Sequence, residues 1–484
     1  MKKILSLILI ILMLAMPLVS CNTDTPKDTD TSTDTGTSDP DLVAPALRES
    51  DEELYVGYGR TCITPYDESG KLIEGYTLAG YAERRNAVNV KDDLYASCTA
   101  VKDKNGNIAI MFALDLHSMG VSYATTLKRL VEREYNIPEE NIFLNVTHTH
   151  AAPHLSDGYE NFVSDKVVET AGLALEDLAL VTALYTGTVR INGMNFIRRY
   201  IYDETGKPIA HIAENDPYMP VVRFVRDGKK DVILTNWAAH CDTVKGNNPT
   251  TISADYVGYF REEAESVLDA HVSLFMAASG DVNPRGHLDG EPTFPGTSRY
   301  GKQLATNLIS NIDNLKRCDI KSEVAASFEK VRVQFDHSTD DKAEEAKEVM
   351  NYFWDVAGSQ ITPELTELIK EHGFQSIYDA MYVRNRSLKG VYERLEVGAL
   401  SIGNVVFAVA PYEMFTKNGV DIKASADEFD GAFMCAYTNG MIGYIASAEA
   451  FDHNIYEVYS RLYVKGTAEA LADSMIATID ELGK

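Results

Sequence analysis

Apolar runs alternate with amphipathic stretches along most of the chain, and this alternation is typical of a layered α/β domain. Continuous apolar runs predict buried strands, and these lie at 108–114, 142–146, 232–237, 273–278, 405–410 and 433–437. Apolar positions at helical spacing predict helices at 123–135, 256–269 and 468–482. Thr467 follows Gly466 and is the expected N-cap of the last helix. The expected fold is α/β, with mixed β-sheets flanked by helices.

A charged helical stretch at 339–373 interrupts this alternation. The Thr362-Pro363 pair is a helix start signal and Gly373 is a stop signal. We interpret the stretch as a peripheral helical insertion, and nothing in its sequence indicates chemistry. Residues 51–484 contain no second linker, repeat or break in composition. They are therefore predicted to form one large domain, although a single core seldom grows this large.

Polar side chains that can bind a metal or polarise a substrate follow several of the predicted strands. The residues concerned are His117, His148, His150, His240, Asn283 and Glu413. In open α/β sheets, ligands bind beyond the carboxyl ends of the strands. The sequence therefore predicts a metal site at the C-terminal ends of the strands.

The Thr-His-Thr-His loop is the clearest of these signals. The chain has 11 histidines, and three of them lie within residues 148–154. Neutral imidazole is the commonest metal ligand, and zinc suits sites that combine histidine with a carboxylate. In an extended loop His148 and His150 would point the same way, because side chains alternate. Both could bind metal, or one could bind metal while the other contacts substrate; two hydrogen-bonded surface histidines are the alternative.

The other signals are ambiguous one by one. His240 alone could be a structural histidine at a strand end. Glu413 could be a metal ligand, a general base or a carboxylate at a helix N-terminus. The Gly-Asp-Val-Asn-Pro segment that contains Asn283 could be a tight turn. Their shared placement after strands is the argument for a common site.

The N-terminal residues predict export. Lys2 and Lys3 precede an apolar run that closes on Leu-Val-Ser-Cys, which is the layout of a secretory signal. The last four residues resemble the lipobox of bacterial lipoproteins, in which the cysteine, here Cys21, is lipidated. We expect residues 1–21 to be a lipoprotein signal peptide; a plain signal peptide or a membrane-spanning anchor is the alternative, but the run is short for a ~20-residue span.

Residues 22–50 are rich in Asp and Thr and lack apolar periodicity, so they are expected to be a disordered linker. Together with the signal segment, this linker predicts an exported cell-envelope lipoprotein anchored to a bacterial membrane.

Charge and cysteine usage exclude several classes of protein. The formal net charge of −27 argues against nucleic-acid binding, which needs a basic surface. An acidic surface also disfavours anionic bilayers, so the expected membrane contact is the lipid anchor. No protein partner is predicted. The cysteines beyond Cys21 are odd in number and scattered, which argues against a disulfide framework or a cysteine zinc site; they are Cys62, Cys98, Cys241, Cys318 and Cys435.

A set of motifs, in order along the chain from about residue 54, resembles the neutral/alkaline ceramidases. The motifs are VGYGR and ITP at 56–65, LAGY at 78–81, THTH at 147–150, SADYVGY at 253–259, GDVNP at 280–284 and NGMIGY at 439–444. The set is much more specific than any one of its members.

The resemblance implies a zinc amidohydrolase that cleaves an N-acyl amide, such as a ceramide-like sphingolipid, by metal-activated water. The implied Zn²⁺ ligands are His148, His240, Glu413 and Tyr444. His150 would lie beside the metal and face the substrate. Arg198 would contact the reacting amide, with Arg199 as the alternative. Tyr444 enters only through the resemblance, since a Gly-Tyr pair after a strand is usually a packing feature.

Two departures from the family bear on the reaction. The family has a serine in the active site where this chain has Asn283, and asparagine cannot act as a nucleophile. Its amide can still donate a hydrogen bond to an oxyanion. The C-terminal immunoglobulin-like domain of longer members is also not expected, because the sequence ends soon after Tyr444. Two alternatives therefore stay open: a zinc hydrolase of another amide or ester, such as a glycan or peptidoglycan-type conjugate, and an inactive lipoprotein that binds lipid or glycan.

Overall fold

The structure is a computed structural model and describes residues 52–156, 158–244, 248, 250–285 and 293–484. The predicted signal segment, with Cys21, and the predicted linker lie outside the described residues. Residues Ser50–Lys484 form one compact unit. No helix in the described ranges combines the length and the apolar character needed to cross a membrane.

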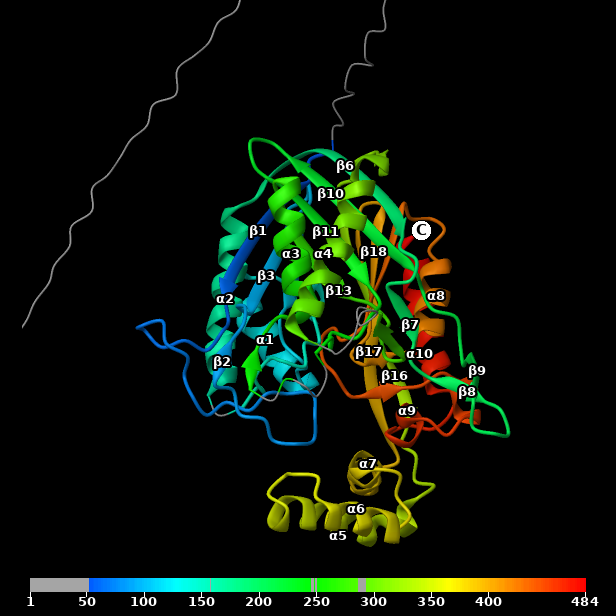
Figure 1. Cartoon of the computed structure of the whole chain (residues 1–484). Coiled ribbons are helices and arrows are strands. Elements are labelled where there is room, and N and C mark those ends of the chain that lie inside the picture. Colours follow the sequence, from blue (N-terminus) through cyan, green and yellow to red (C-terminus); the bar gives the residue numbers. More distant parts are fainter. Residues whose placement is uncertain (1–51, 157, 245–247, 249, 286–292) are drawn as a thin grey trace, which may run out of the picture. The chain divides into compact units, whose positions relative to one another are not determined.

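A mixed sheet, nine-stranded in the part of the chain that the structure describes, forms the centre of this unit (Figure 1). The strand order is β13-β11-β10-β6-β1-β3-β4-β5, with β15 also paired to β6. The β4–β5 and β11–β13 pairs are parallel, and the other pairs are antiparallel. The strands are β1 (Tyr55–Cys62), β3 (Tyr95–Lys102), β4 (Ile108–Leu114), β5 (Ile142–Val146), β6 (Ala179–Arg190), β10 (Tyr218–Arg226), β11 (Asp231–Trp237), β13 (Ala270–Met276) and β15 (Lys316–Cys318).

A smaller sheet packs face to face against the large one. Its order is β16-β17-β18-β20, with β18 and β20 parallel. The strands are β16 (Val324–Gln334), β17 (Tyr392–Ile402), β18 (Val405–Val409) and β20 (Gly431–Cys435). Phe224 and Phe275 of the large sheet and Phe407 of the small one lie in the core between them. This burial of large aromatic side chains fixes the two sheets against each other.

Short two-stranded ribbons link the main elements and carry much of the candidate site. They are β7 (Asn195–Ile197) with β14 (Val282–Pro284), β19 (Glu413–Met414) with β21 (Tyr444–Ile445), β2 (Asn89–Val90) with β12 (Thr251–Ile252), and β8 (Tyr200–Tyr202) with β9 (Pro208–His211).

Helices cover the outer faces of both sheets (Figure 1). The large sheet is covered by α1 (Val121–Tyr135), α2 (Tyr159–Glu176), α3 (Asp255–Leu268) and α4 (Phe294–Asn311). The small sheet is covered by α8 (Thr416–Ala424) and α10 (Thr467–Leu482), and a short α9 (Tyr456–Tyr459) lies beside β21. The expected α/β fold with mixed sheets flanked by helices is confirmed.

The predicted helical insertion is also confirmed. It contains α5 (Ala343–Asn351), a π-helical turn (Tyr352–Val356), α6 (Pro363–Glu371) and α7 (Ile377–Ser387), which Figure 1 shows below the sheets. Its helices share a small apolar core of their own. Thr362 caps α6 by accepting a hydrogen bond from the Leu365 N–H, and Gly373 has a positive φ of 74° just beyond the end of that helix.

The expected cap of α10 is wrong. Thr467 is the first residue of the helix, and Gly466, with φ of 91°, is the N-cap. The Thr467 hydroxyl donates to the Val464 carbonyl at 2.8 Å, so it binds the preceding turn instead of the helix N–H groups. A left-handed N-cap conformation favours glycine over threonine, and this decides which of the two residues caps the helix.

The two ends of the large sheet approach each other through one side chain. Asn145 of β5 accepts a hydrogen bond from the Met276 N–H of β13 at 2.9 Å. Its amide also donates to the Ala436 carbonyl at 2.7 Å, next to the end of β20. Strands β5, β13 and β20 therefore end close together, which brings the segments that follow them to one place.

Candidate metal centre

His148, His240 and Glu413 converge on one point, as the sequence predicts. His148 follows β5, His240 follows β11, and Glu413 begins β19. The Nε2 atoms of the two histidines are 3.2 Å apart, and they lie 3.5 Å and 3.7 Å from Glu413 Oε2. All three residues are buried, with exposed fractions of 1%, 2% and 4%. The three side chains therefore form a group that can hold a metal ion.

The backbone orients both imidazoles. His148 Nδ1 donates to the His117 carbonyl at 2.8 Å, and His240 Nδ1 donates to the Ser279 carbonyl at 3.0 Å. In a neutral imidazole this leaves Nε2 as an acceptor, which is the state that binds metal. Burial, followed by the charge of Arg198, lowers the pKa of His240 well below its usual range. His240 is therefore a neutral imidazole whose Nε2 faces the same point as His148 Nε2.

The spacing and the unpaired carboxylate fit a bound divalent ion. Glu413 Oε2 is buried and has no hydrogen-bond partner among the described residues. A buried carboxylate oxygen without a donor is costly unless it is paired or coordinates a metal. Ligands about 2.0–2.1 Å from a tetrahedral zinc ion stand roughly 3.3 Å from one another, which matches the observed distances between these atoms.

His117 forms a second group with His148 and His150; the sequence placed it among the strand-end side chains, but the family resemblance did not make it a ligand. The His117 and His148 rings are 4.5 Å apart, and His117 Nδ1 contacts the Ser118 hydroxyl at 2.9 Å. We favour the group that contains Glu413, because a carboxylate supplies the negative charge that an all-histidine group lacks. The placement of His117 after β4, parallel to β5, was the signal available for finding it.

The Thr-His-Thr-His loop is not the extended loop in which His148 and His150 would point the same way. His148 has a left-handed backbone with φ of 60°. The two imidazoles still meet, because His150 Nε2 lies 3.3 Å from His148 Nε2. The strained residue turns the chain so that His148 reaches back toward the His117 carbonyl while His150 approaches from the side.

A neighbouring loop holds His150 in place. Arg85 donates to the His150 carbonyl at 2.9 Å and stacks over the Tyr81 ring. Tyr81 meets the His150 ring edge to face at 5.3 Å. Burial, and then His148, lowers the pKa of His150 well below its usual range. His150 is therefore a neutral imidazole beside the candidate metal group.

Tyr444 and Arg198 form the other side of the group. Parallel pairing of β19 with β21 places Tyr444 directly beside Glu413. Arg198 donates to the Tyr444 hydroxyl at 3.0 Å and to Glu457 at 2.8 Å. Burial raises the pKa of Tyr444, and Arg198 opposes this rise. Arg199 binds the same Glu457 and lies over the Tyr456 ring, and among the described residues it makes no hydrogen bond to Tyr444, so Arg198 is the arginine that contacts the proposed ligand.

Asn283 lies in the ribbon next to Arg198. In the β14–β7 ribbon Asn283 is paired with Phe196. The register continues one step further, where the Arg198 N–H donates to the Asp281 carbonyl at 2.9 Å. Directly opposed and alternate residues share one face of such a ribbon, so Asn283 and Arg198 are on the same face. The preceding Val282 carbonyl accepts the His240 N–H at 3.0 Å, which ties this ribbon to the metal group.

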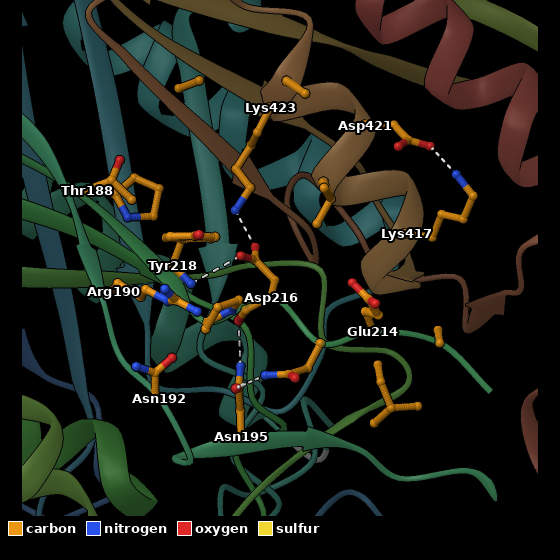
Figure 2. A pocket seen from close by; sticks show the side chains of 18 of the residues that line it. Thr188, Arg190, Asn192, Asn195, Glu214, Asp216, Tyr218, Lys417, Asp421 and Lys423 are labelled. Atoms are coloured by element: carbon orange, nitrogen blue, oxygen red, sulfur yellow. Dashed lines mark hydrogen bonds and ion pairs between the residues drawn. The ribbon is translucent and has the colours of Figure 1, made fainter. Parts of the chain in front are cut away.

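A cavity adjoins strand β7, which precedes Arg198. It has a volume of about 1270 Å³ and is lined by β7, β10, α8 and the segment before β10. Figure 2 shows Lys423 and Asp216 paired in it, with Arg190, Asn192 and Asn195 on the adjoining wall. None of its lining residues is one of the three candidate ligands. The cavity has both polar and apolar lining residues and adjoins the β7–β14 ribbon.

The five cysteines in the described range are free thiols, as their spacing predicts. Cys98, Cys241 and Cys435 are buried, whereas Cys62 and Cys318 are partly exposed. None of them belongs to a candidate metal group among the described residues.

The fold is shared with solved ceramidase structures. No family model and no curated protein sequence matches the chain. The structure of neutral ceramidase from Pseudomonas aeruginosa matches with a TM-score of 0.69 and 16% identity over 90% of this chain and 75% of that one. A structure of ceramidase complexed with C2 matches with a TM-score of 0.67 and 16% identity over 89% and 75% of the two chains. The chain therefore has the neutral ceramidase fold that its motifs predict.

Proposed function

We propose that this protein is a zinc-dependent amidohydrolase that cleaves the N-acyl amide of a ceramide-like sphingolipid. The observation that carries the proposal is the convergence of His148, His240 and Glu413, with an unpaired carboxylate oxygen, in a fold shared with neutral ceramidase. The sequence motifs that resemble the ceramidases contribute His148, Gly80 and Tyr444 to this same region.

The donor set suits zinc, and Tyr444 is the fourth ligand in the proposal. Two neutral imidazoles, one carboxylate and one phenol give a site of mixed nitrogen and oxygen ligands, which zinc accepts. When bound, zinc polarises a carbonyl oxygen and lowers the pKa of a water molecule to about 7. The backbone carbonyls of His117 and Ser279 hold the two imidazoles with Nε2 toward the metal position.

Three further side chains carry the rest of the chemistry. His150 is neutral, so its Nε2 can accept a proton from the attacking water and return one to the leaving amine. The Arg198 guanidinium lies between Tyr444 and Glu457, where it can hold negative charge that develops on the amide oxygen. Asn283 can donate an amide hydrogen to the same oxygen. No serine nucleophile is required.

A second candidate function keeps the metal and changes the substrate. The neighbouring cavity combines charged and amide side chains, among them Arg190, Asp216 and Lys423 (Figure 2), with apolar ones such as Phe196 and Phe429. Its charged and amide groups could hold the sugar-bearing or charged portion of another amide or ester. Hydrolysis of such a conjugate is therefore the alternative to ceramide.

The full chain, purified in detergent, provides the test. Zinc content is measured by mass spectrometry, and hydrolysis is measured with a fluorescent ceramide and a panel of other amides and esters. His148→Ala is the test variant, and His453→Ala, which lies outside both candidate groups, is the matched control. One zinc per chain and ceramide turnover, both lost only in His148→Ala, would support the proposal. Zinc with turnover of another substrate would select the alternative, and neither zinc nor turnover would leave a binding protein.

We also propose that the protein is a lipoprotein of the bacterial cell envelope, anchored through Cys21. The signal segment and its terminal cysteine support this localisation. Expression with labelled palmitate in a bacterial host should label the parent protein and leave Cys21→Ser unlabelled. Labelling of both proteins, or of neither, would contradict the anchor.

A further inference from the structure

The helical insertion reaches the candidate site through α7. Ile377, Ala380 and Val383 of this helix lie in the core of the insertion. Tyr378 and Tyr382 are four residues apart, and residues at this spacing lie one above the other on the same side of a helix. Both tyrosines contact residues outside the insertion, Ala82 and Gly443 respectively.

Tyr378 docks the insertion on the loop that holds His150. Its hydroxyl accepts a hydrogen bond from the Ala82 N–H at 2.8 Å. The Ser359 carbonyl of the insertion accepts from the Arg84 N–H at 3.1 Å. Ala82 and Arg84 lie one and three residues after Tyr81, whose ring contacts His150. The insertion is thereby fixed relative to one side of the metal group.

Tyr382 approaches the other side of the metal group. A Cβ atom on Gly443 would lie 2.7 Å from the Tyr382 hydroxyl, so only glycine allows this approach. Gly443 also has a φ of 90°, which favours glycine. The Gly443 carbonyl accepts the Glu413 N–H at 3.0 Å, and Tyr444 follows Gly443 in the chain. The Tyr382 hydroxyl therefore lies against the backbone that positions two of the proposed ligands.

Aromatic rings connect Tyr378 to the proposed ligand Tyr444. Tyr378 and Tyr456 meet edge to face at 5.4 Å, and Tyr456 meets Tyr444 in the same way at 5.4 Å. The Tyr382 hydroxyl forms no hydrogen bond with another side chain or backbone group in the part of the chain that the structure describes. Burial, followed by the charge of Glu413, raises the pKa of Tyr382, so its hydroxyl stays protonated at neutral pH. The Tyr382 hydroxyl is therefore a hydrogen-bond donor without an acceptor among the described residues.

We propose that Tyr382 is a specificity-determining residue whose hydroxyl donates a hydrogen bond to a hydroxyl oxygen of the substrate head group. Tyr378 and Tyr456 form the aromatic wall beside that head group. This proposal rests on the proposed function, because that function places the scissile amide at the metal group. Through Tyr382, the insertion makes the enzyme selective for amides whose amine portion carries hydroxyl groups near the scissile bond.

The test compares Tyr382→Phe with Tyr352→Phe in the zinc-loaded full chain. Tyr352 lies in the π-helical turn of the same insertion and packs against the insertion core, so its substitution is a matched control. The substrates are a short-chain ceramide and an N-acyl alkylamine of equal chain length without hydroxyl groups. We expect Tyr382→Phe to lower kcat/KM about tenfold for the ceramide and less than twofold for the alkylamide, because only the ceramide loses a hydrogen bond. Tyr352→Phe should leave both values unchanged.

A binding measurement separates this proposal from the proposed function. The affinity of the chelator-treated full chain for the short-chain ceramide is measured by calorimetry for the parent and for both variants. If the parent binds ceramide but does not hydrolyse it when zinc is restored, the proposed function fails. In that case a tenfold weaker Kd for Tyr382→Phe, with an unchanged Kd for Tyr352→Phe, would still support the role of Tyr382. Equal losses on both substrates would indicate a structural role and overturn the proposal. Absence of any loss, or absence of ceramide binding by the parent, would overturn it as well.

Discussion

A Cβ atom on Gly80 would come within 2.2 Å of His150 Nδ1. The backbone of residue 80 fixes the position of a Cβ atom there, so only a movement of the His150 imidazole could relieve the clash. The absence of a side chain at residue 80 is therefore what allows His150 to stand beside the metal group.

Gly80→Ala should displace His150 and reduce hydrolysis. A misplacement of about 1 Å in a catalytic group can cost roughly 10²-fold in rate, and we expect a loss of this order in kcat. Gly70→Ala is the matched control, because Gly70 also has a positive φ, 79° against 94°, but has open space around it. Each variant should lose about 1 kcal/mol of stability from backbone strain. Equal activities of the two variants would contradict the role of this contact.

Arg198→Lys and Arg199→Lys should differ in activity. Both arginines pair with the buried Glu457, but only Arg198 also donates to Tyr444. Lysine keeps the charge and loses the planar fork that reaches two acceptors at once. We expect kcat to fall about 10²-fold in Arg198→Lys, as for loss of an oxyanion donor, and less than threefold in Arg199→Lys. Steady-state hydrolysis by the two variants, checked for equal thermal stability, decides which arginine serves the site.

Asn283 should contribute a hydrogen bond and no covalent step. Asn283→Ala is expected to lower kcat about 10²-fold through the lost amide donor. Asn283→Ser restores a donor and should recover part of the rate. Asn192→Ala, an exposed asparagine in the neighbouring cavity, is the control for a general effect of the substitution (Figure 2). Unchanged hydrolysis in Asn283→Ala would remove this residue from the reaction.

His271 should contribute to a loss of stability at acid pH. Burial lowers the pKa of His271 against the opposing charge of Glu265, and its ring stacks on Tyr58 at 4.3 Å. A lowered folded-state pKa means that the unfolded chain binds the proton first. The contribution is therefore complete above about pH 6.5 and declines as the pH falls through that value toward the folded pKa.

The substitution His271→Phe keeps the stacked ring and removes the titration. It should flatten the decrease in unfolding free energy between pH 6.5 and 5, by at most about 1.4 kcal/mol per pH unit for one group. Urea unfolding of the metal-free parent and variant across this range provides the measurement. Identical pH profiles would show that His271 titrates alike in the folded and unfolded chain.

Local sequence patterns were sufficient to predict the buried strands and the candidate ligands that follow them. The predicted strands 108–114 and 142–146 coincide with β4 and β5, because continuous apolar runs bounded by polar residues mark their own ends. The strand ends then indicated His148, His240 and Glu413, and these three do converge. Periodicity and strand-end chemistry thus identified most of the candidate metal group.

Contacts between distant segments could not be predicted in this way. The His117 carbonyl orients His148, and this role depends on the parallel pairing of β4 with β5. The contact between Tyr382 of α7 and Gly443 joins the insertion to the main unit, and no local sequence pattern indicates it. The left-handed backbone of His148 could not be predicted either, since a histidine in that conformation is stabilised by its tertiary contacts.

The hydrogen bond between Asn145 and Met276 has a consequence for the order of folding. It joins the first and last strands of the sheet order, β13 and β5, which are far apart until the sheet curves round. His148 lies three residues after Asn145, while His240 comes from a strand next to β13. We therefore expect the group of His148, His240 and Glu413 to be complete only once these strands have come together, so that its metal affinity is a property of the folded chain.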